Sequence, residues 1–334
     1  MTDATGRKPL STLAADSLLL SAAVIWGTTF VAQKMATLHM GPVLFNGIRY
    51  AFGALLVLPL AIRGWRMVTD PRARRNAIVG GLLAGAAMAV ASTTQQVGMQ
   101  TASVSSAGFI TGLYVIFVPL LGLLVGQRVR WPVWIGALLA LCGMFFLSAY
   151  NPNGGVMEVN TGDLWILACA VAWAMHVQIV GWAAPTADPF VISTVQFAVT
   201  GVVCLVGALV LSTVFADSPW GAREAFDWDS LRAAALPLAF AAVMSTGVAF
   251  TFQVIAQGSA PPAHAAIILS LESVFSALAE AACLLLGGTA WAWLGAPMTR
   301  WKLLGSALMF AGVLVSQVRL RQWKRLLGAA PSAT

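Results

Sequence analysis

One carboxylate, Glu272, lies within an apolar stretch where a charge is expensive. It follows the Pro261-Pro262 pair by about eleven residues. A charge near the centre of a bilayer costs about 2.5–3.5 kcal/mol on insertion scales, so such residues usually face the interior of a helix bundle or a water-filled path. Glu272 could therefore exchange a proton with the solution. The alternative is a structural carboxyl that hydrogen-bonds to a neighbouring helix.

Two more titratable residues, Glu280 and His264, share this stretch. Glu280 is eight residues beyond Glu272, which places it roughly 80° around a helix. The two carboxylates could border one cavity, or Glu280 could lie near the membrane interface. His264 could accept protons. Its position shortly after the two prolines favours the simpler alternative, a place at the water interface.

Arg49 is the main cation expected inside an apolar stretch. A guanidinium can bind a carboxylate with two parallel hydrogen bonds, which suits recognition of an acidic group. It can equally extend its head group towards water or pair with a carboxylate of the protein. Arg49 is only about two turns from Pro42, so its depth leaves these alternatives open.

Paired glutamines offer donors and acceptors without a charge. Gln96 and Gln100 are four residues apart, as are Gln253 and Gln257, so each pair shares one face of a helix. Their amides could bind a zwitterionic or amide-bearing solute, or they could form hydrogen bonds between helices. Gln96 and Gln253 are the better candidates for a cavity because they are expected to lie deeper.

An aromatic and polar stripe occurs twice. Trp26, Thr29 and Gln33 recur at helical spacing, and Trp173 and His176 repeat the first two places later in the chain. An aromatic wall beside a few polar groups is typical of a small-molecule pocket. A Trp in such a segment can instead face lipid or pack against other helices.

Motifs for enzymatic chemistry are missing from the sequence. It has no Walker loop, no dinucleotide-binding glycine pattern, no His-rich metal cluster and no nucleophile elbow. We therefore expect no enzyme activity, no cofactor and no bound metal, and transport driven by ATP is not expected from this chain alone.

The elements that position these residues must be membrane-spanning helices. Of 334 residues, 59% are hydrophobic and only 9% charged, and the mean hydropathy is +0.83. A soluble domain carries roughly 25% charged residues. The composition therefore predicts a multi-pass membrane protein that contacts the lipid bilayer, and it argues against a nucleic-acid partner despite the net charge of +7.

Ten apolar tracts are long enough to be spans of about 20 residues. They lie near 15–34, 42–62, 77–99, 102–124, 131–149, 162–182, 189–211, 231–256, 261–286 and 300–320. Ten spans put both termini on one side. Thirteen of the 19 Lys and Arg then lie on the side of the termini and four on the other, which by the positive-inside rule predicts both termini in the cytoplasm.

The two halves of the chain resemble each other. Ala23–Trp26 aligns with Ala170–Trp173 and Pro42 with Pro189 at an offset of 147, so that Gln196 is the counterpart of Arg49. Five spans per half force the second copy to enter the membrane from the opposite side, an arrangement typical of secondary transporters. The division predicted is a five-helix repeat over 15–149, a linker over 150–161, an inverted repeat over 162–320 and a cytoplasmic tail over 321–334.

Glycines seven residues apart mark the last span of each half. Gly136 and Gly143 correspond to Gly305 and Gly312. Small residues let helices approach closely. These stripes predict either packing between helices or a homodimer.

Several stretches give the chain a resemblance to the EamA type of the drug/metabolite transporter superfamily. They are Trp26–Gln33, Gly41–Tyr50 with Phe45-Asn46, Gln96–Pro119 and Ile268–Phe275. The resemblance implies an all-helical protein of ten spans in two inverted five-helix repeats, and it adds Asn46 to the substrate-binding candidates. The family usually has a Glu where spans four and nine end, whereas this sequence has Gly126-Gln127 and Gly287-Gly288.

The function expected is a secondary transporter of a bacterial inner membrane that exports small metabolites, amino acids or similar zwitterionic solutes. Proton-coupled and uncoupled transport both fit the sequence. The alternatives are a multidrug or cation exporter and, less well supported, a membrane-embedded enzyme. The residues expected to bind substrate are Trp26, Thr29, Gln33, Asn46, Arg49, Gln96, Trp173, His176 and Gln253. The residues expected to couple or gate transport are Glu272, Glu280 and His264.

Overall fold

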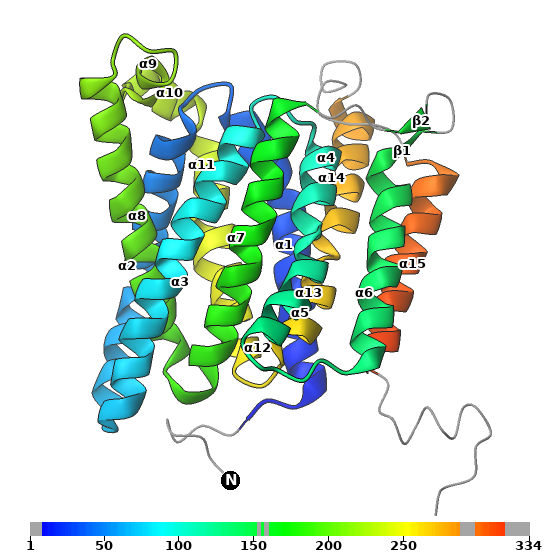
Figure 1. The fold of residues 1–334 in the computed structure, drawn as a ribbon. Coiled ribbons are helices and arrows are strands. Elements are labelled where there is room, and N and C mark those ends of the chain that lie inside the picture. Colours follow the sequence, from blue (N-terminus) through cyan, green and yellow to red (C-terminus); the bar gives the residue numbers. More distant parts are fainter. Residues whose placement is uncertain (1–8, 152–154, 157–159, 288–297, 318–334) are drawn as a thin grey trace, which may run out of the picture.

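The described chain consists almost entirely of helices that run side by side (Figure 1). The computed structural model describes residues 9–151, 155–156, 160–287 and 298–317. Within these residues, eight helical segments are long and apolar enough to cross a membrane. The expected all-helical, multi-pass membrane fold is therefore confirmed at this level, while the number of ten spans and their orientation stay predictions.

The elements up to residue 156 run along the bundle, where α4 and α5 follow one another in the same direction (Figure 1). They are α1 (Thr12–Ala36), α2 (Pro42–Met67), α3 (Pro71–Gly98), α4 (Val104–Gly112), α5 (Tyr114–Leu124), α6 (Trp131–Met144), the π-helical turn η1 (Phe145–Ala149) and the two short strands β1 (Tyr150–Asn151) and β2 (Gly155–Val156). The strands pair antiparallel, Tyr150 with Val156, within the predicted linker.

The remaining elements repeat much of this order. They are α7 (Thr161–Ala183), η2 (Ala184–Thr186), α8 (Pro189–Val214), α9 (Gly221–Glu224), α10 (Trp228–Ala233), α11 (Ala235–Phe240), the π-helical η3 (Ala241–Phe250), α12 (Thr251–Gln257), α13 (Pro262–Leu269), α14 (Glu272–Gly287) and α15 (Arg300–Gln317). The predicted tail over 321–334 lies outside the described residues. Residues 9 and 317, the ends of the described chain, lie on the same face of the bundle (Figure 1).

Proline and polar caps set where several of these helices begin. Pro42, Pro71 and Pro189 each occupy the first turn, where a missing N–H costs nothing because that N–H has no partner within the helix. Asp70 and Asp188 cap α3 and α8 by accepting hydrogen bonds from backbone N–H groups of the first turn. The corresponding helices α2 and α8 thus start with the same proline signal, 147 residues apart.

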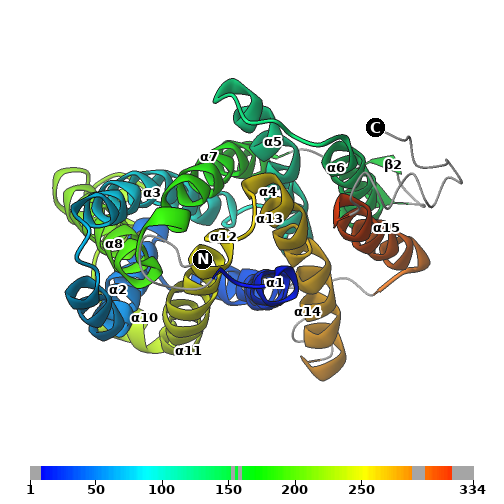
Figure 2. The same ribbon diagram turned by 90° about the horizontal axis from the view of Figure 1, so that it is seen from below.

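Corresponding helices also pack on one another. α2 lies against α8, and α6 lies against α15, while α3 packs between α7 and α8 and α1 packs against α11–α12 and α14. Viewed from below, the α6–α15 pair stands at one end of the bundle and α2, α3 and α8 at the other (Figure 2). The centre between these two ends is formed by α1, α7, α12 and the pieces of α4, α5, α13 and α14.

The glycine stripes lie between α6 and α15 of the same chain. A Cβ on Gly136 would meet the carbonyl of Gly312, and one on Gly143 would meet the carbonyl of Gly305, with the reverse contacts equally close. The glycine stripes therefore allow α6 and α15 to pack closely, because each stripe is covered by the other. A homodimer built on these four glycines is not compatible with this arrangement, and that prediction is corrected here.

The Gly143→Ala substitution is expected to destabilise the protein. The added methyl group would press on the backbone of α15, and overpacking of this kind costs about 1–3 kcal/mol. Gly207→Ala is the matched control, since its methyl group would meet only a side-chain atom of Val43, 3.3 Å away. Thermal unfolding in detergent should show a lower Tm for Gly143→Ala only. Equal Tm values for both variants would contradict tight packing between α6 and α15.

Candidate functional site

Two segments of span length are broken at mid-height. The segment Val104–Leu124 divides at Leu113 into α4 and α5, and the segment Pro262–Gly287 divides at Ser270-Leu271 into α13 and α14. The broken segments touch, because the Ser273 hydroxyl donates a 2.6 Å hydrogen bond to the carbonyl oxygen of Gly108. Discontinuous helices of this kind form binding sites near the midplane of many transporters.

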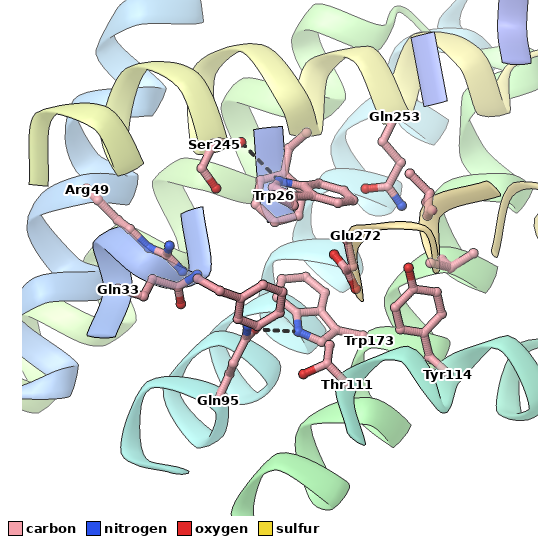
Figure 3. Close-up of a pocket in the computed structure, with 14 residues that line it drawn as sticks. Trp26, Gln33, Arg49, Gln95, Thr111, Tyr114, Trp173, Ser245, Gln253 and Glu272 are labelled. Atoms are coloured by element: carbon pink, nitrogen blue, oxygen red, sulfur yellow. Dashed lines mark hydrogen bonds between the residues drawn. The ribbon is translucent and has the colours of Figure 1, made fainter. Parts of the chain in front are cut away.

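A third irregular segment faces these breaks. Between α11 and α12, the ten residues Ala241–Phe250 form a π-helix, which is wider than an α-helix and changes the direction of the side chains that follow. Ser245 of this segment and Gln253 of α12 point towards the same central region (Figure 3), and Phe250 also lines it. Irregular backbone therefore surrounds the centre of the bundle on three sides.

A pocket with a cavity volume of about 40 Å³ lies at this centre. Both halves of the chain contribute to it. Its lining consists of Trp26, Phe30, Gln33, Arg49, Gln95, Thr111, Tyr114, Trp173, Val177, Ser245, Phe250, Gln253, Leu269 and Glu272.

Aromatic rings form one wall of the pocket. The ring of Phe250 lies between Trp26 and Trp173, with centroid distances of 4.6 and 5.4 Å. The indole N–H of Trp173 donates to Gln95 Oε1 at 2.9 Å, and that of Trp26 donates to the Ser245 carbonyl at 3.4 Å (Figure 3). Because both indole N–H groups are held in this way, the faces of the rings have fixed orientations.

Arg49 reaches the pocket as a buried cation. Its side chain is 2% exposed, and one terminal nitrogen donates to the Tyr50 hydroxyl at 3.0 Å while the guanidinium lies over the Tyr50 ring, 4.6 Å from the centroid. Its Nε has no hydrogen-bond partner, and no carboxylate of the described chain lies within 4.0 Å. Arg49 therefore retains its capacity to bind an anion.

Glu272 lines the same pocket as a buried carboxyl. It is the first residue of α14, directly after the break, and it is 4% exposed. Its Oε1 lacks a hydrogen-bond partner, and no Lys, Arg or His of the described chain is within 4.0 Å. The buried hydroxyl of Tyr114 lies beside it at the other break (Figure 3). The site therefore holds a basic and an acidic group, and neither has an ion-pair partner in the described part of the chain.

Glutamine amides supply neutral polar contacts around the pocket. The Oε1 atoms of Gln33 and Gln253 are buried without a partner among the described residues. The Gln253 amide nitrogen donates to Gln257 Oε1 at 2.9 Å, and Gln257 in turn donates to the Val177 carbonyl. In Figure 3, Gln33 lies near Arg49, and Gln253 lies towards Tyr114, at the other end of the pocket.

Six of the residues predicted from sequence meet in this pocket. They are Trp26, Gln33, Arg49, Trp173, Gln253 and Glu272. The structure brings them together from five different elements, α1, α2, α7, α12 and α14. Their roles in binding or coupling stay predictions.

The other candidates lie outside the lining. Thr29 and Gln96 hydrogen-bond to carbonyls of α1, and Asn46 donates to the Ser92 carbonyl of α3. His176 Nε2 pairs with Gln196 Oε1 at 3.0 Å, immediately behind the aromatic wall.

The two remaining titratable candidates hold helices together away from the pocket. Glu280 accepts hydrogen bonds from the backbone N–H and the hydroxyl of Ser105 and lies 3.8 Å from Lys302 Nζ. His264 Nε2 lies 2.8 Å from Asp16 Oδ1.

Several lining residues were missed by the sequence analysis. The pocket is lined by Gln95 and not by the adjacent Gln96. The sequence alone does not show which of two adjacent residues on α3 faces the centre of the bundle. Tyr114 lines the pocket directly after the break at Leu113. Phe250 lines the pocket at the end of the π-helix. A regular helical pattern could not reveal these two, but the Leu113-Tyr114 stretch was part of the motif that carried the family resemblance.

A carboxylate closes the bundle at the end remote from the described termini. Glu224 of α9 accepts hydrogen bonds from the backbone N–H groups of Val43 and Leu44, at the start of α2, at 3.0 and 2.6 Å. Burial raises the pKa of the Glu224 carboxyl, although these two N–H groups act in the opposite direction. Because the docked carboxyl binds a proton more tightly than an exposed one, docking is most stable below the ordinary pKa of Glu and weakens as the pH rises through the raised pKa.

The Glu224→Ala substitution is expected to free α9 from α2. Trypsin should then cleave after Arg223 about fivefold or more faster, because Arg223 donates to the Thr37 carbonyl and to Gln100 only while α9 is docked. Asp229→Ala is the control, since Asp229 is exposed and pairs only with Arg232. Limited proteolysis followed by mass spectrometry measures the rate, and an unchanged cleavage rate would show that Glu224 does not hold α9.

Comparison with known proteins identifies the family. The EamA-like transporter family profile matches residues 13–149 and 160–317. The chain belongs to this family. An uncharacterized transporter of Archaeoglobus fulgidus is 30% identical over 281 residues, which cover 84% of this chain and 81% of that protein.

Other similarities are more distant. The uncharacterized inner membrane transporter YedA of Escherichia coli (strain K12) is 22% identical over 56% of this chain and 59% of its own length. The uncharacterized transporter YoaV of Bacillus subtilis is 24% identical over 47% of this chain and 53% of its own. One crystal structure with 18% identity matches 94% of this chain and 100% of its own with a TM-score of 0.71, which shows a shared fold.

These comparisons settle the broad class of this EamA-like transporter. It is an integral, multi-pass membrane protein of the drug/metabolite transporter superfamily, and its relatives carry the names of transporters rather than enzymes. Membrane transport is the activity that family membership supports.

Proposed function

We propose that this EamA-like transporter is a secondary transporter that exports small metabolites, amino acids or similar zwitterionic and amphipathic solutes, by alternating access. One observation carries the proposal: Arg49 and Glu272, both buried and both unpaired within the described chain, line one pocket. A buried charge without a partner is unfavourable. A solute with a carboxylate and an ammonium group supplies a partner to each, and its apolar part contacts the aromatic wall of Trp26, Trp173 and Phe250.

The proposed mechanism uses two inverted repeats of five spans. The packing of α2 on α8 and of α6 on α15, together with the corresponding breaks at Leu113 and at Ser270-Leu271, supports a two-fold relation between the halves. We propose ten spans, with α6–η1 and α15 as the shorter two and both termini in the cytoplasm. The Arg-rich end of the bundle then faces the cytoplasm of a bacterial cell, and the membrane is its inner membrane.

Glu272 is the proposed site of proton coupling. Its carboxyl lies at a helix break, where a change of protonation can act directly on the angle between α13 and α14. Glu280 and His264 are already bound to Ser105 and Asp16, respectively. Their proposed part is gating, as contacts between helices that must break when an end of the bundle opens.

A cation exporter is the second candidate. A carboxyl beside the faces of several aromatic rings is the usual chemistry of a site for organic cations. Glu272, Tyr114 and Phe250 provide this combination. This alternative leaves the buried Arg49 without a partner and would place two like charges in one pocket, so the zwitterion fits better.

Counterflow into proteoliposomes tests the proposal. Liposomes preloaded with an unlabelled solute are diluted into the labelled one without an ion gradient, and the panel contains amino acids and hydrophobic cations. Saturable exchange of amino acids supports the proposed function. Exchange of cations alone selects the second candidate, and no exchange by protein whose Tm and size-exclusion profile show a folded state contradicts both.

A further inference from the structure

A second hollow lies on the outside of the bundle, remote from the central pocket. It is an apolar groove of about 270 Å³ between α2, α3 and α8, at the end that carries the described termini. Its lining consists of Leu58, Ala61, Ile62, Trp65, Arg66, Ile78, Val191, Thr194 and Val195. Leu58 and Ile62 are 39% and 44% exposed, so the groove opens sideways to the hydrocarbon of the membrane.

Several arginines lie on the segments that form the mouth of this groove. Arg66 lines it, and the side chains of Arg63, Arg72 and Arg75 are exposed nearby, none of them within 4.0 Å of a carboxylate of the described chain. The helices α2, α3 and α8 contain no Asp or Glu. Two acidic residues, Asp70 and Asp188, cap the N-termini of α3 and α8. The mouth is therefore positively charged.

Trp65 forms a fixed wall between the apolar groove and the arginines. Arg74 donates to the carbonyls of Val68 and Trp65 and lies over the Trp65 ring, 4.9 Å from its centroid. Tryptophan is enriched at the level of lipid head groups. The wall thus marks the depth at which the hydrocarbon ends and the head groups begin.

A buried polar group also lines the groove. The Thr194 hydroxyl is buried and has no hydrogen-bond partner in the part of the chain that the structure describes. Leaving a buried hydroxyl without a partner is unfavourable. A hydroxyl or ester oxygen of a bound molecule would satisfy it.

We propose that this groove binds one anionic phospholipid of the surrounding leaflet. An acyl chain lies in the groove between α2 and α8, the ester region contacts Thr194, and the phosphate is bound by Arg66 with the neighbouring arginines. Each Lys or Arg near a membrane surface contributes about 1 kcal/mol to the attraction of anionic lipid. The apolar groove is what distinguishes this site from one for free phosphate, which has no chain to place there.

The bound lipid would connect the two segments that match the family, because α2 and α8 belong to different ones. A ligand that binds one arrangement of the helices stabilises that arrangement by mass action. Anionic lipid should therefore stabilise the folded protein more than zwitterionic lipid does, with no requirement for a transported solute.

Native mass spectrometry of the full-length purified protein tests this site. Phosphatidylglycerol and phosphatidylcholine with the same acyl chains are titrated separately, and the bound fraction gives the affinity. We expect tighter binding of phosphatidylglycerol and a loss of about fivefold in Arg66→Gln, the fold-change that corresponds to one cation. Arg128→Gln, an exposed arginine on the same face away from the groove, is the matched control and should bind as the wild type does.

Two further measurements distinguish the contribution of the apolar groove to lipid binding from that of the arginine charges. Ile78→Phe fills the groove and should abolish phosphatidylglycerol binding, with the Tm in lipid-free detergent showing that the protein is folded. Glycerol phosphate at millimolar concentration should not displace the lipid. Equal affinity for both lipids, equal losses in Arg66→Gln and Arg128→Gln, or displacement by glycerol phosphate would each overturn the proposal. Because no solute is involved, its failure is distinct from failure of the proposed transport function.

Discussion

Arg49→Gln is expected to lower the affinity for carboxylate-bearing solutes about 30- to 100-fold in counterflow. Loss of one partner of a buried, hydrogen-bonded charge pair costs at least about 2 kcal/mol, and about 1.4 kcal/mol corresponds to tenfold. Arg49 has no carboxylate partner in the described chain. Its removal should therefore affect the bound solute rather than an internal ion pair.

The fold is expected to tolerate this change. Gln196, the counterpart of Arg49 in the second half, shows that an amide fits the related place on α8, where it pairs with His176. Removal of an unpaired buried charge should leave the Tm unchanged or raise it.

Two variants control the experiment. Arg49→Lys keeps the charge but not the planar pair of donors, and it should fall between wild type and Arg49→Gln. Arg232→Gln removes an exposed arginine and should have no effect. Equal losses for carboxylates and for hydrophobic cations would show that Arg49 supports the pocket rather than binds the solute.

Glu272→Gln is expected to abolish the response of transport to a pH gradient while counterflow persists. The amide has nearly the same shape as the carboxyl but carries no exchangeable charge, so the pocket stays intact and the proton site is lost. Uptake driven by an imposed pH gradient should fall to the rate measured without one. Labelled-solute uptake at several internal and external pH values measures this.

Glu280→Gln is the matched control for the same element. Glu280 is bound by Ser105 and faces Lys302 rather than the pocket. Transport by the Glu280→Gln variant should still respond to the pH gradient. If Glu272→Gln keeps that response, the carboxyl is not the coupling site. If counterflow is lost as well, Glu272 binds the solute instead.

The sequence predicted the class of fold because the bilayer imposes strong constraints. Long apolar tracts, prolines at helix starts and a repeat at an offset of 147 are local signals, and they led to spans close to those observed. The interior polar residues Arg49 and Glu272 could be found for the same reason, since a charge in such a tract is conspicuous. Their meeting in one pocket could not, because it depends on how helices from both halves rotate and pack.

The remaining differences have local causes. Gln95 and Gln96 are adjacent on α3, and their side chains point about 100° apart around the helix axis. Choosing between them requires the rotation of α3 about its axis, which the sequence does not supply. The break at Leu113 and the π-helix before Phe250 interrupt the regular spacing on which a helical pattern relies. The glycine stripes were recognised as a contact surface, but only the structure shows that α6 and α15 of one chain cover both of them.

The two broken segments have a further consequence for how a solute could be moved. α4 and α14 are tied to each other by Ser273 and Gly108, while α5 and α13 continue from the breaks towards the opposite face. Tyr114 and Glu272 are the first residues after the two breaks. If the proposed solute binds at these breaks, a change of angle at one of them is passed to the other through the contact between α4 and α14, and both ends of the bundle then move in a single step.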